Sequence, residues 1–246
     1  MIKWVFEKDF FNDNLEKEVI KRGNHIVYID HNSDFSGLGD TEPIMYRGGL
    51  SKIHMFKNPP VHIQRYRCTE YYSYRLIGQH LLNKDAAFYL PRLLDPSSIK
   101  YPVFVRPDSG FKYFTGFVAN SAKDIEYALE SLSDSQLCMI SSVKDIVEEY
   151  RFVIGQANYE NFVIAGSMYS PECMTVQPDH KVWKFIQSVL DQEGSSPDDM
   201  YTLDACVLRD GSIKIVELNS FSCAGLYECN VERIVSFINT WYKNWI

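Results

Sequence analysis

Several common features are missing from the sequence, and each absence removes a class of protein. No run of 18 apolar residues occurs, so a membrane-spanning helix is not expected. Charged residues begin at Lys3, too early for a signal peptide, and the six cysteines form no CxxC pair; both observations favour a reducing cytoplasm. Acidic residues outnumber basic ones by 32 to 25, and this net charge of −7 argues against a surface built to bind duplex nucleic acid.

Two kinds of catalytic signature are missing as well. The chain has no Gly-Lys-Ser/Thr sequence of the Walker A type, and no Ser-His-Asp or metal-binding histidine pattern. What remains is an ordinary globular composition over 246 residues, with 46% hydrophobic and 23% charged residues, which excludes a disordered, collagen-like or coiled-coil chain. The length fits one large domain or two to three small lobes.

The chain opens with a βαβ pattern. Short apolar runs predict strands over 2–6, 25–30 and 44–46, and a helix over 12–22 has its apolar residues on one face. This order predicts a small parallel sheet. Further strands are predicted over 101–105, 114–118, 137–142, 150–154, 161–167, 201–208 and 213–218. Helices are predicted over 69–82, 121–132, 182–190 and 231–245.

Three oxygen-bearing side chains fall on one predicted hairpin near the end of the sequence. Asp210-Gly211 between two strands is a strong hairpin signal. With a two-residue turn, Asp204 lies directly opposite Glu217, and Asn219 shares their face because side chains alternate along a strand. Facing carboxylates repel each other, so the pairing makes sense if a cation lies between them. The three side chains suit Mg²⁺, which takes few protein ligands and completes its octahedron with water and phosphate.

A second interpretation of this hairpin is a solvent-exposed face at the edge of a sheet. The two-residue turn pairs Leu208 with Ile213, and it would leave both residues on that exposed face together with Ile215, which is awkward. A three-residue turn with a bulge would shift the register and weaken the argument for a metal site. Both interpretations stay open on the sequence alone.

A cationic side chain directly follows the predicted strand over 101–105. Arg106 closes the strand, and a loop with Gly110 and Lys112 follows it. A strand-end arginine can hold phosphate through two parallel hydrogen bonds, and Lys112 can add a point charge at the outer phosphates. The alternative is an exposed loop with two cations and no ligand.

The connection after the strand over 137–142 is a third candidate. Backbone groups at Ser142, Val143 and Lys144 can contact the edge of an adenine, and the carboxylate of Glu149 can hold ribose hydroxyls. Glu149 and Arg151 also share one face of the next strand, so a surface ion pair is the alternative.

Aromatic and basic residues interleave over 62–75, where three arginines stand against one glutamate. Such a segment can bind a carboxylate substrate, a peptide or single-stranded nucleic acid. Arg67 in this segment and Arg47 before Gly48-Gly49 are therefore candidates for substrate contact. The alternatives are a helix that packs its tyrosines on the core and an Arg47 that simply ends a strand.

In this order, the strand-end cation, the hinge and the carboxylate hairpin resemble the ATP-grasp superfamily, whose members include D-alanine–D-alanine ligase and glutathione synthetase. The superfamily usually has a lysine at the end of this strand. With Arg106 in that place, the chain resembles the clade in which arginine replaces this lysine, a clade that is widespread in bacterial and phage genomes. The resemblance covers about residues 100–225 by motif. The matching stretches are YRGG at 46–49, CTEYY at 68–72, LNK at 82–84, RP at 106–107, KYFTG at 112–116, EYR at 149–151 and ELNSFS at 217–222.

The resemblance implies an α/β architecture of α+β lobes: the ATP-grasp fold preceded by a Rossmann-like lobe. The division it implies is a pre-ATP-grasp lobe over 1–95, a first ATP-grasp subdomain over 96–148, and a second over 149–246 with the metal site. It also implies an ATP- and Mg²⁺-dependent ligase that joins a carboxylate to an amine, on a small molecule or peptide, through an acyl phosphate. The alternatives are an ATP-binding module without ligase activity and a kinase on the same fold.

Roles for individual residues follow from the resemblance. Arg106 and Lys112 would contact the phosphates, and Arg151 would contact phosphate or the substrate carboxylate; these three are the candidate catalytic residues. Residues 142–144 would form the adenine hinge, Glu149 would bind ribose, and the three hairpin side chains would hold one or two Mg²⁺. The loop that carries Lys112 has only two glycines, which departs from the family pattern and puts its closure over phosphate in doubt.

Overall fold

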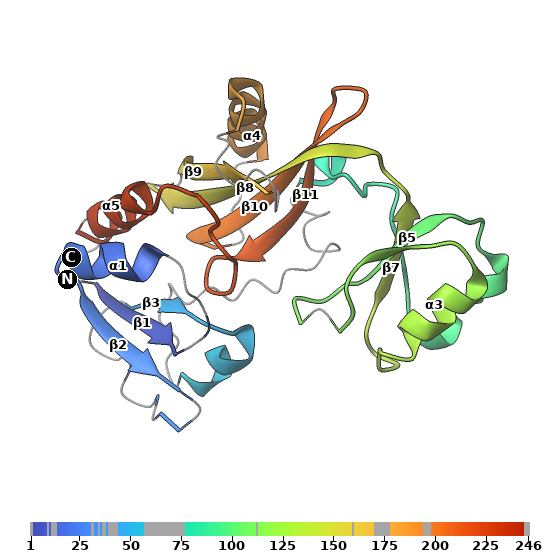
Figure 1. The fold of residues 1–246 in the computed structure, drawn as a ribbon, viewed down its shortest axis with the longest axis horizontal. Helices are drawn as coiled ribbons and strands as arrows, with labels where there is room; N and C mark the ends of the chain where they lie inside the picture. Colours follow the sequence, from blue (N-terminus) through green and yellow to red (C-terminus); the bar gives the residue numbers. More distant parts are fainter. Residues whose placement is uncertain are drawn as a thin grey trace.

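The computed structural model of the chain describes residues 2–8, 10, 14–30, 32, 33, 35, 38, 44–56, 77–111, 113–158, 160–169, 178–193 and 198–243. Three β-sheets follow one another along these residues, one of three strands and two of four (Figure 1). Helices pack against each sheet, which confirms the predicted α/β class. Within these residues, no helix has the length and apolar character needed to cross a membrane.

The first sheet is the predicted βαβ unit, with all of its strands parallel in the order β2-β1-β3. Its elements are β1 (Lys3–Glu7), α1 (Asn14–Lys21), β2 (His25–Ile29), β3 (Ile44–Arg47) and the 3₁₀ helix η1 (Leu50–Met55). Leu15 and Val19 of α1 are fully buried, as the apolar spacing of this helix predicts.

The second sheet is antiparallel, in the order β4-β7-β5-β6. Its elements are β4 (Ala87–Tyr89), β5 (Val103–Pro107), β6 (Phe117–Ala119), α3 (Ala122–Leu129) and β7 (Cys138–Ser142), with the 3₁₀ helices η3 (Pro91–Leu93) and η4 (Pro96–Ser98). The 3₁₀ helix η2 (Gly78–His80) precedes β4 and is flanked by Ile77 and Leu81, which pack in the core of the third sheet. At the start of α3, the Ser121 amide donates to Asp124 Oδ2 at 3.0 Å, one half of a capping box that satisfies the end of the helix. Strand β4 pairs with β7 in this sheet, although it precedes residue 96, where the first ATP-grasp subdomain is predicted to begin.

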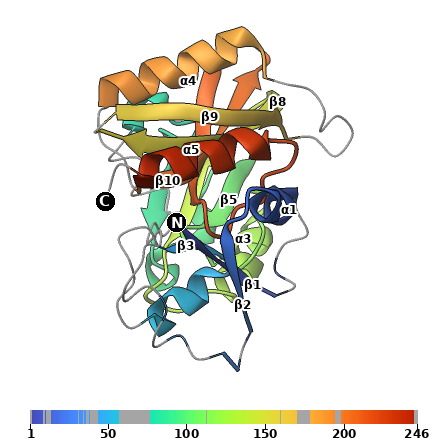
Figure 2. The ribbon, with the colours of Figure 1, turned by 90° about the vertical axis from the view of Figure 1, so that its left-hand side faces the viewer.

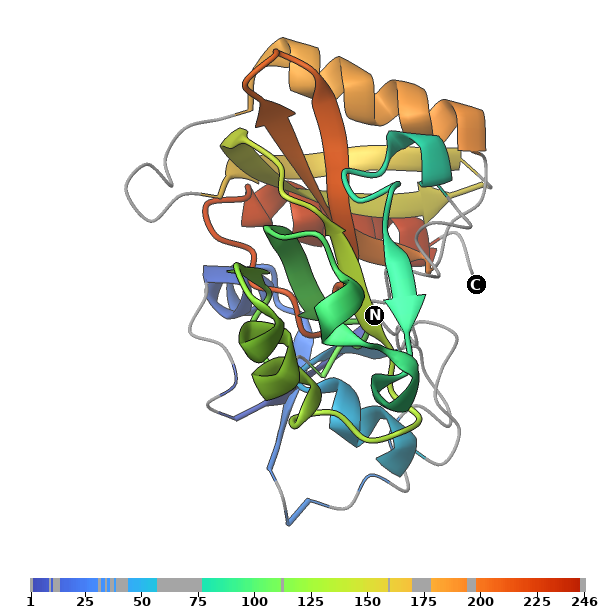
Figure 3. The same cartoon turned by 90° about the vertical axis from the view of Figure 1, so that its right-hand side faces the viewer.

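The third sheet is the central one, with the antiparallel order β11-β10-β8-β9. Its elements are β8 (Ile146–Ala157), β9 (Glu160–Met168), α4 (His180–Glu193), β10 (Met200–Leu208), β11 (Ile213–Ser220) and α5 (Val231–Lys243). Ile186 and Val189 of α4 pack on Phe152 and Leu203 of the sheet, so α4 covers one of its faces. Figure 2 shows α4 and α5 on either side of β8 and β9, and Figure 3 shows the second sheet with α3 in front of the central sheet.

Helix α5 joins the first sheet to the central one. Its residues Val235 and Ile238 share a core with Trp4 and Phe6 of β1 and with Val153 of β8. Helices α1 and α5 lie side by side in Figure 2 and pack against each other. This packing fixes the end of β3 relative to the end of β11, and the candidate site lies close to both.

The hairpin of β10 and β11 has the predicted pairing at its far end but not at its turn. The Leu208 amide donates to the Ser212 carbonyl at 2.9 Å and Gly211 takes a φ of +81°, so the turn contains three residues. Val207, not Leu208, therefore lies opposite Ile213, and this part of the predicted register is wrong. A bulge in β11, between the turn and the carboxylates, adds one unpaired residue and restores the predicted register. Asp204 therefore lies opposite Glu217 as predicted.

The bulge also removes the difficulty with the isoleucines of β11. It lets Ile215 turn into the core beneath α4, where it is fully buried, while Glu217 points to the opposite face. Regular alternation would have placed both side chains on one face. The hairpin is therefore not an exposed sheet edge with stranded apolar residues.

The helix predicted over 69–82 lies mostly outside the described residues. At its described end, Ile77 is α-helical and the 3₁₀ helix η2 follows it, so among the described residues the prediction of an α-helix is wrong only over 78–82. After η2, Leu81 forms a parallel bridge with Ile215, and the Leu82 amide donates to the Ile215 carbonyl at 2.7 Å. At Leu81 and Leu82, pairing with the edge strand β11 therefore takes the place of the helix that the spacing of apolar residues predicts.

Candidate active site

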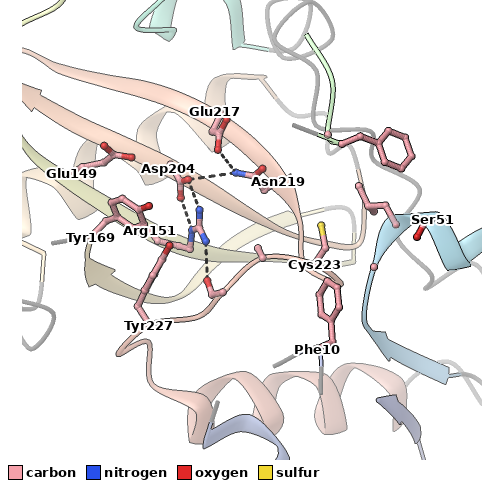
Figure 4. Close-up of a pocket in the computed structure, with 16 residues that line it drawn as sticks. Phe10, Ser51, Glu149, Arg151, Tyr169, Asp204, Glu217, Asn219, Cys223 and Tyr227 are labelled. Atoms are coloured by element: carbon pink, nitrogen blue, oxygen red, sulfur yellow. Dashed lines mark hydrogen bonds and ion pairs between the residues drawn. The ribbon is translucent and has the colours of Figure 1, made fainter. Parts of the chain in front are cut away.

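Three charged side chains form a row across three neighbouring strands of the central sheet. Arg151 of β8 is the register partner of Asp204 in β10, and Asp204 is the partner of Glu217 in β11. Asn219 lies two residues beyond Glu217 on the same face. All four line one pocket (Figure 4). The structure thus brings the three predicted metal ligands together and adds an arginine beside them.

Arg151 and Asp204 form a buried ion pair. Arg151 Nε lies 2.7 Å from Asp204 Oδ1, and Nη2 lies 2.6 Å from Oδ2, with the side chains 8% and 4% exposed. Nη1 of the same guanidinium donates to the Gly225 carbonyl at 2.9 Å. Burial opposes the charge on Arg151, yet the Asp204 carboxylate outweighs it and raises the pKa of Arg151 above its ordinary value.

Two tyrosines, which the sequence analysis missed, enclose this arginine. The Arg151 guanidinium lies 4.9 Å from the centre of the Tyr227 ring and 5.7 Å from that of Tyr169. The two rings meet edge to face, 4.7 Å apart between centres. Tyr227 also has a φ of +49°, a strained backbone conformation for a bulky side chain. Neither tyrosine stands in a recognisable motif, so only the fold reveals them.

Arg106 reaches the row from the second sheet. Its Nη1 donates to Glu217 Oε2 at 2.7 Å, with the two side chains 13% and 15% exposed. Asn219 Nδ2 donates to the other oxygen of Glu217 at 2.8 Å and lies 3.4 Å from Asp204 Oδ2. The strand-end cation and the carboxylate hairpin, which are 111 residues apart in sequence, therefore meet between the second and third sheets.

The row lines a cavity of about 490 Å³. Phe10 and residues 49–51, which follow β1 and β3, contribute to its wall, and residues 223–225 with Tyr227 contribute from the loop after β11. Gly110 and Phe111, from the loop that follows β5, complete a wall to which segments next to all three sheets contribute. A concave site between lobes with a few convergent charged groups has the form of a ligand-binding site.

A known protein family matches the part of the chain that carries Arg106, Arg151 and the three hairpin side chains. A family model for an ATP-grasp domain, the second family of the clade in which arginine takes the place of the usual lysine, matches residues 88–237, more than half of the chain. The chain belongs to this ATP-grasp family. No curated protein matches it.

Solved structures with a similar fold are far from the chain in sequence. The D-alanine-D-alanine ligase from Coxiella burnetii has a TM-score of 0.69 at 10% identity, covering 100% of this chain and 94% of that chain. An ATP-grasp RimK domain protein from Sphaerobacter thermophilus has a TM-score of 0.60 at 12% identity, covering 98% and 96%. N5-carboxyaminoimidazole synthase from Aspergillus clavatus, solved with ADP and 5-aminoimidazole ribonucleotide, has a TM-score of 0.52 at 14% identity, covering 89% and 69%. These likenesses confirm the predicted ATP-grasp fold.

The donor set of this ATP-grasp chain has the chemistry that Mg²⁺ requires. Asp204, Glu217 and Asn219 present carboxylate and amide oxygens, the hard ligands that Mg²⁺ prefers. Among the described residues, no group of three or more His, Cys, Asp and Glu side chains could hold a metal ion. Two carboxylates with an amide suit Mg²⁺, since this ion is usually bound through one or two carboxylates together with water and substrate phosphates.

The predicted adenine hinge of this ATP-grasp chain lies outside the wall of the cavity. Ser142, Val143 and Lys144 connect β7 to β8 and do not line it, whereas Glu149 does. Asp85, which the sequence analysis did not single out, holds the hinge: it accepts from the Ser142 amide at 3.0 Å and from Lys144 Nζ at 2.7 Å. Burial acts to raise the pKa of Asp85, but the hydrogen bonds from Lys144 and Ser142 outweigh it and lower the pKa to about 2.

This pKa gives a prediction for the Asp85→Asn variant. A carboxyl group whose pKa is lowered by folding stabilises the folded state above its unfolded pKa, and that contribution is lost as the pH falls toward the folded pKa. The variant is therefore expected to be less stable than the wild type near neutral pH, by up to about 1 kcal/mol because the pair is partly exposed. The difference is expected to shrink between about pH 4 and pH 2, as measured by urea unfolding. A difference that stays constant over this range would contradict the assignment.

Of the two candidate substrate residues, Arg47 lies in the part of the chain that the structure describes. Arg47, at the end of β3, is fully buried and does not line the cavity. Its guanidinium contacts backbone carbonyls of the loop after β11 rather than the open space of the pocket. Arg67 and Lys112 lie outside the described residues.

Proposed function

We propose that the chain is an ATP- and Mg²⁺-dependent ligase that joins a carboxylate to an amine through an acyl phosphate. The observation that carries this proposal is the row of Arg151, Asp204 and Glu217, which Arg106 meets from the neighbouring lobe at a cavity between three lobes. Phosphoryl transfer depends mainly on positioning and on neutralising charge, and this row supplies cations and metal ligands. Membership of the ATP-grasp family supports the same conclusion.

The proposed reaction has two steps. In the first, a carboxylate oxygen of the substrate attacks the γ-phosphorus of ATP, the bond from that phosphorus to the β–γ bridging oxygen breaks, and ADP leaves with the electron pair. In the second, the amine nitrogen attacks the acyl carbon and loses a proton to solvent. The bond from the acyl carbon to the phosphate oxygen then breaks, and inorganic phosphate leaves. Both steps place negative charge on phosphate oxygens, which cations near the row can stabilise.

Each part of the site has a proposed task. Arg106 and Lys112 bind the phosphates, residues 142–144 contact adenine through their backbone, and Glu149 binds the ribose hydroxyls. Arg151 holds Asp204 in place through the buried ion pair. When bound by Asp204, Glu217 and Asn219, Mg²⁺ would neutralise phosphate charge. To reach phosphate, Arg106 must exchange its hydrogen bond with Glu217 for one with the nucleotide.

The test is turnover with a pool of acceptors. The purified chain with ATP and Mg²⁺ is expected to release ADP when amino acids and short peptides are supplied, and mass spectrometry is expected to show an amide product. Omitting Mg²⁺, or omitting the pool, is expected to abolish the release. Tight Mg²⁺-ATP binding without turnover on any acceptor would favour a binding module instead. A phosphorylated product without an amide would favour a kinase on the same fold.

A further inference from the structure

The loop of residues 221–225, which follows the metal-ligand strand β11, is held from behind by the end of β3. Arg47 Nη2 donates to the Ala224 carbonyl at 3.0 Å, and Nη1 donates to the Phe221 carbonyl. The guanidinium also lies over the Phe221 ring, 4.8 Å from its centre. The loop is 174 to 177 residues away in sequence, so this contact joins the first lobe to the site.

Gly48, the residue after Arg47, also holds the loop of residues 221–225. The Gly48 amide donates to the Ser222 carbonyl at 2.8 Å, so Arg47 and Gly48 together hold the carbonyls of residues 221, 222 and 224. A Cβ at Gly48 would overlap the Tyr46 hydroxyl and lie 2.7 Å from Glu7 Oε2, so only glycine allows this close approach. Backbone carbonyls buried away from water need such partners, since leaving one unpaired costs free energy.

The opposite side of the same loop faces the cavity. Cys223, Ala224 and Gly225 line it, and the Gly225 carbonyl accepts the hydrogen bond from Arg151. Arg151 in turn holds both oxygens of Asp204. A continuous set of contacts therefore runs from Arg47 through the loop to the row of charged residues, although Arg47 itself has no surface in the pocket.

From these contacts we infer that Arg47 is a positioning residue for the pocket, not a substrate ligand. It fixes the wall at 221–225 and, through Gly225, the orientation of Arg151. Arginine suits this task because its planar fork reaches two carbonyls at once while its face stacks on an aromatic ring. The inference rests on the proposed function only in taking this cavity as the ligand site.

Cys223 provides a readout that does not depend on activity. Its side chain is partly exposed on the loop, whereas Cys138, Cys206 and Cys229 are buried. In Arg47→Lys, a single ammonium nitrogen replaces the guanidinium group, so it cannot hold both carbonyls in the same way. The loop is therefore expected to open more often, and Cys223 is expected to react with iodoacetamide about tenfold faster. Peptide mapping by mass spectrometry measures the rate at Cys223 itself. An unchanged rate in folded Arg47→Lys protein would overturn the inference.

Val5→Ala is the control for a general loss of stability. Val5 lies on β1 directly beside Tyr46, is fully buried, and makes none of the loop contacts. It is expected to lower the thermal unfolding midpoint but to leave the Cys223 rate unchanged. The same acceleration in Val5→Ala would mean that Arg47 acts through stability alone, which would overturn the inference.

Nucleotide binding adds a second readout. Replacing residues that orient metal ligands without binding the metal themselves typically lowers metal affinity by about 10- to 100-fold. Arg47→Lys is therefore expected to raise the Mg²⁺ concentration needed to support binding of a non-hydrolysable ATP analogue by about tenfold, while Val5→Ala leaves it unchanged. If Cys223 reacts faster but Mg²⁺ dependence is unchanged, the link from the loop to the metal ligands is wrong. If the wild type binds no nucleotide at all, the proposed function fails while the Cys223 result still stands.

A measurement on the unmodified protein covers the case in which Arg47→Lys does not fold. The amides of Cys223 and Ala224 donate to the Ser220 carbonyl at 3.3 and 3.1 Å, and these bonds last only while Arg47 and Gly48 hold the loop in place. The peptide over 221–227 is therefore expected to exchange its amide hydrogens clearly more slowly than an unstructured peptide of the same sequence. Exchange over 221–227 at the rate of the unstructured peptide would overturn the inference.

Discussion

Replacing Glu217 by glutamine is expected to lower Mg²⁺-dependent ADP release by at least about 100-fold while the chain stays folded. Glutamine keeps the size of the side chain and can still accept the hydrogen bond that Arg106 donates to Glu217. It lacks the negative charge that a metal ion requires. Stabilisation of a phosphoryl group by a metal is worth several kcal/mol, and each increment of about 1.4 kcal/mol changes the rate about tenfold. A coupled assay of ADP release, with thermal unfolding as the check on folding, measures the effect.

The same variant separates the two partners of Glu217. Without metal, Glu217 holds Arg106 through an ion pair, and glutamine keeps only the weaker neutral hydrogen bond, so the guanidinium exchanges more readily to phosphate. Metal-free nucleotide is therefore expected to bind Glu217→Gln at least as tightly as the wild type, whereas the gain in affinity from Mg²⁺ is lost. Titration calorimetry with and without Mg²⁺ distinguishes the two effects. Glu160→Gln, at an exposed carboxylate on β9, is the matched control and is expected to behave like the wild type. An equal gain from Mg²⁺ in all three proteins would contradict the metal site.

The pairing of Asp204 with Glu217 could be predicted from the sequence, but through a turn that is wrong. The three-residue turn displaces the register by one residue, and the bulge in β11 displaces it back. A hairpin signal such as Asp-Gly reports only on the turn. The bulge depends on Ile215 finding its place beneath α4, which is a tertiary contact that the local pattern does not contain.

The helices and strands were predictable where one face is buried. Helix α4 shows this, since its apolar spacing matches the face that packs on the central sheet. Partners far apart in sequence were not predictable. Arg151 and Asp204 are 53 residues apart and meet because β8 and β10 are neighbours in the sheet. Arg47 likewise looked like a substrate contact, because nothing near it in sequence shows the carbonyls that it binds.

The buried ion pair of Arg151 and Asp204 is expected to make Arg151→Met a strongly destabilising substitution. Removing one partner leaves a buried charge without its counter-ion, which is expected to cost about 4 kcal/mol of unfolding free energy. Asp204 is 3% exposed, so water cannot take over the role of the guanidinium. Urea unfolding monitored by tryptophan fluorescence measures the loss.

The double variant Arg151→Met, Asp204→Asn decides where that loss comes from. If the unpaired charge is the cause, removing it is expected to recover most of the stability, which gives a large coupling energy between the two positions. If the double variant is no more stable than Arg151→Met, the loss comes instead from the contacts of Arg151 with Gly225 and the two tyrosines. The exposed pair of Arg209 and Asp145 is the control, since with side chains 73% and 60% exposed Arg209→Met is expected to change little. Because both members of the pair are replaced in the double variant, recovered stability without recovered ADP release would show that the pair serves the site as well as the fold.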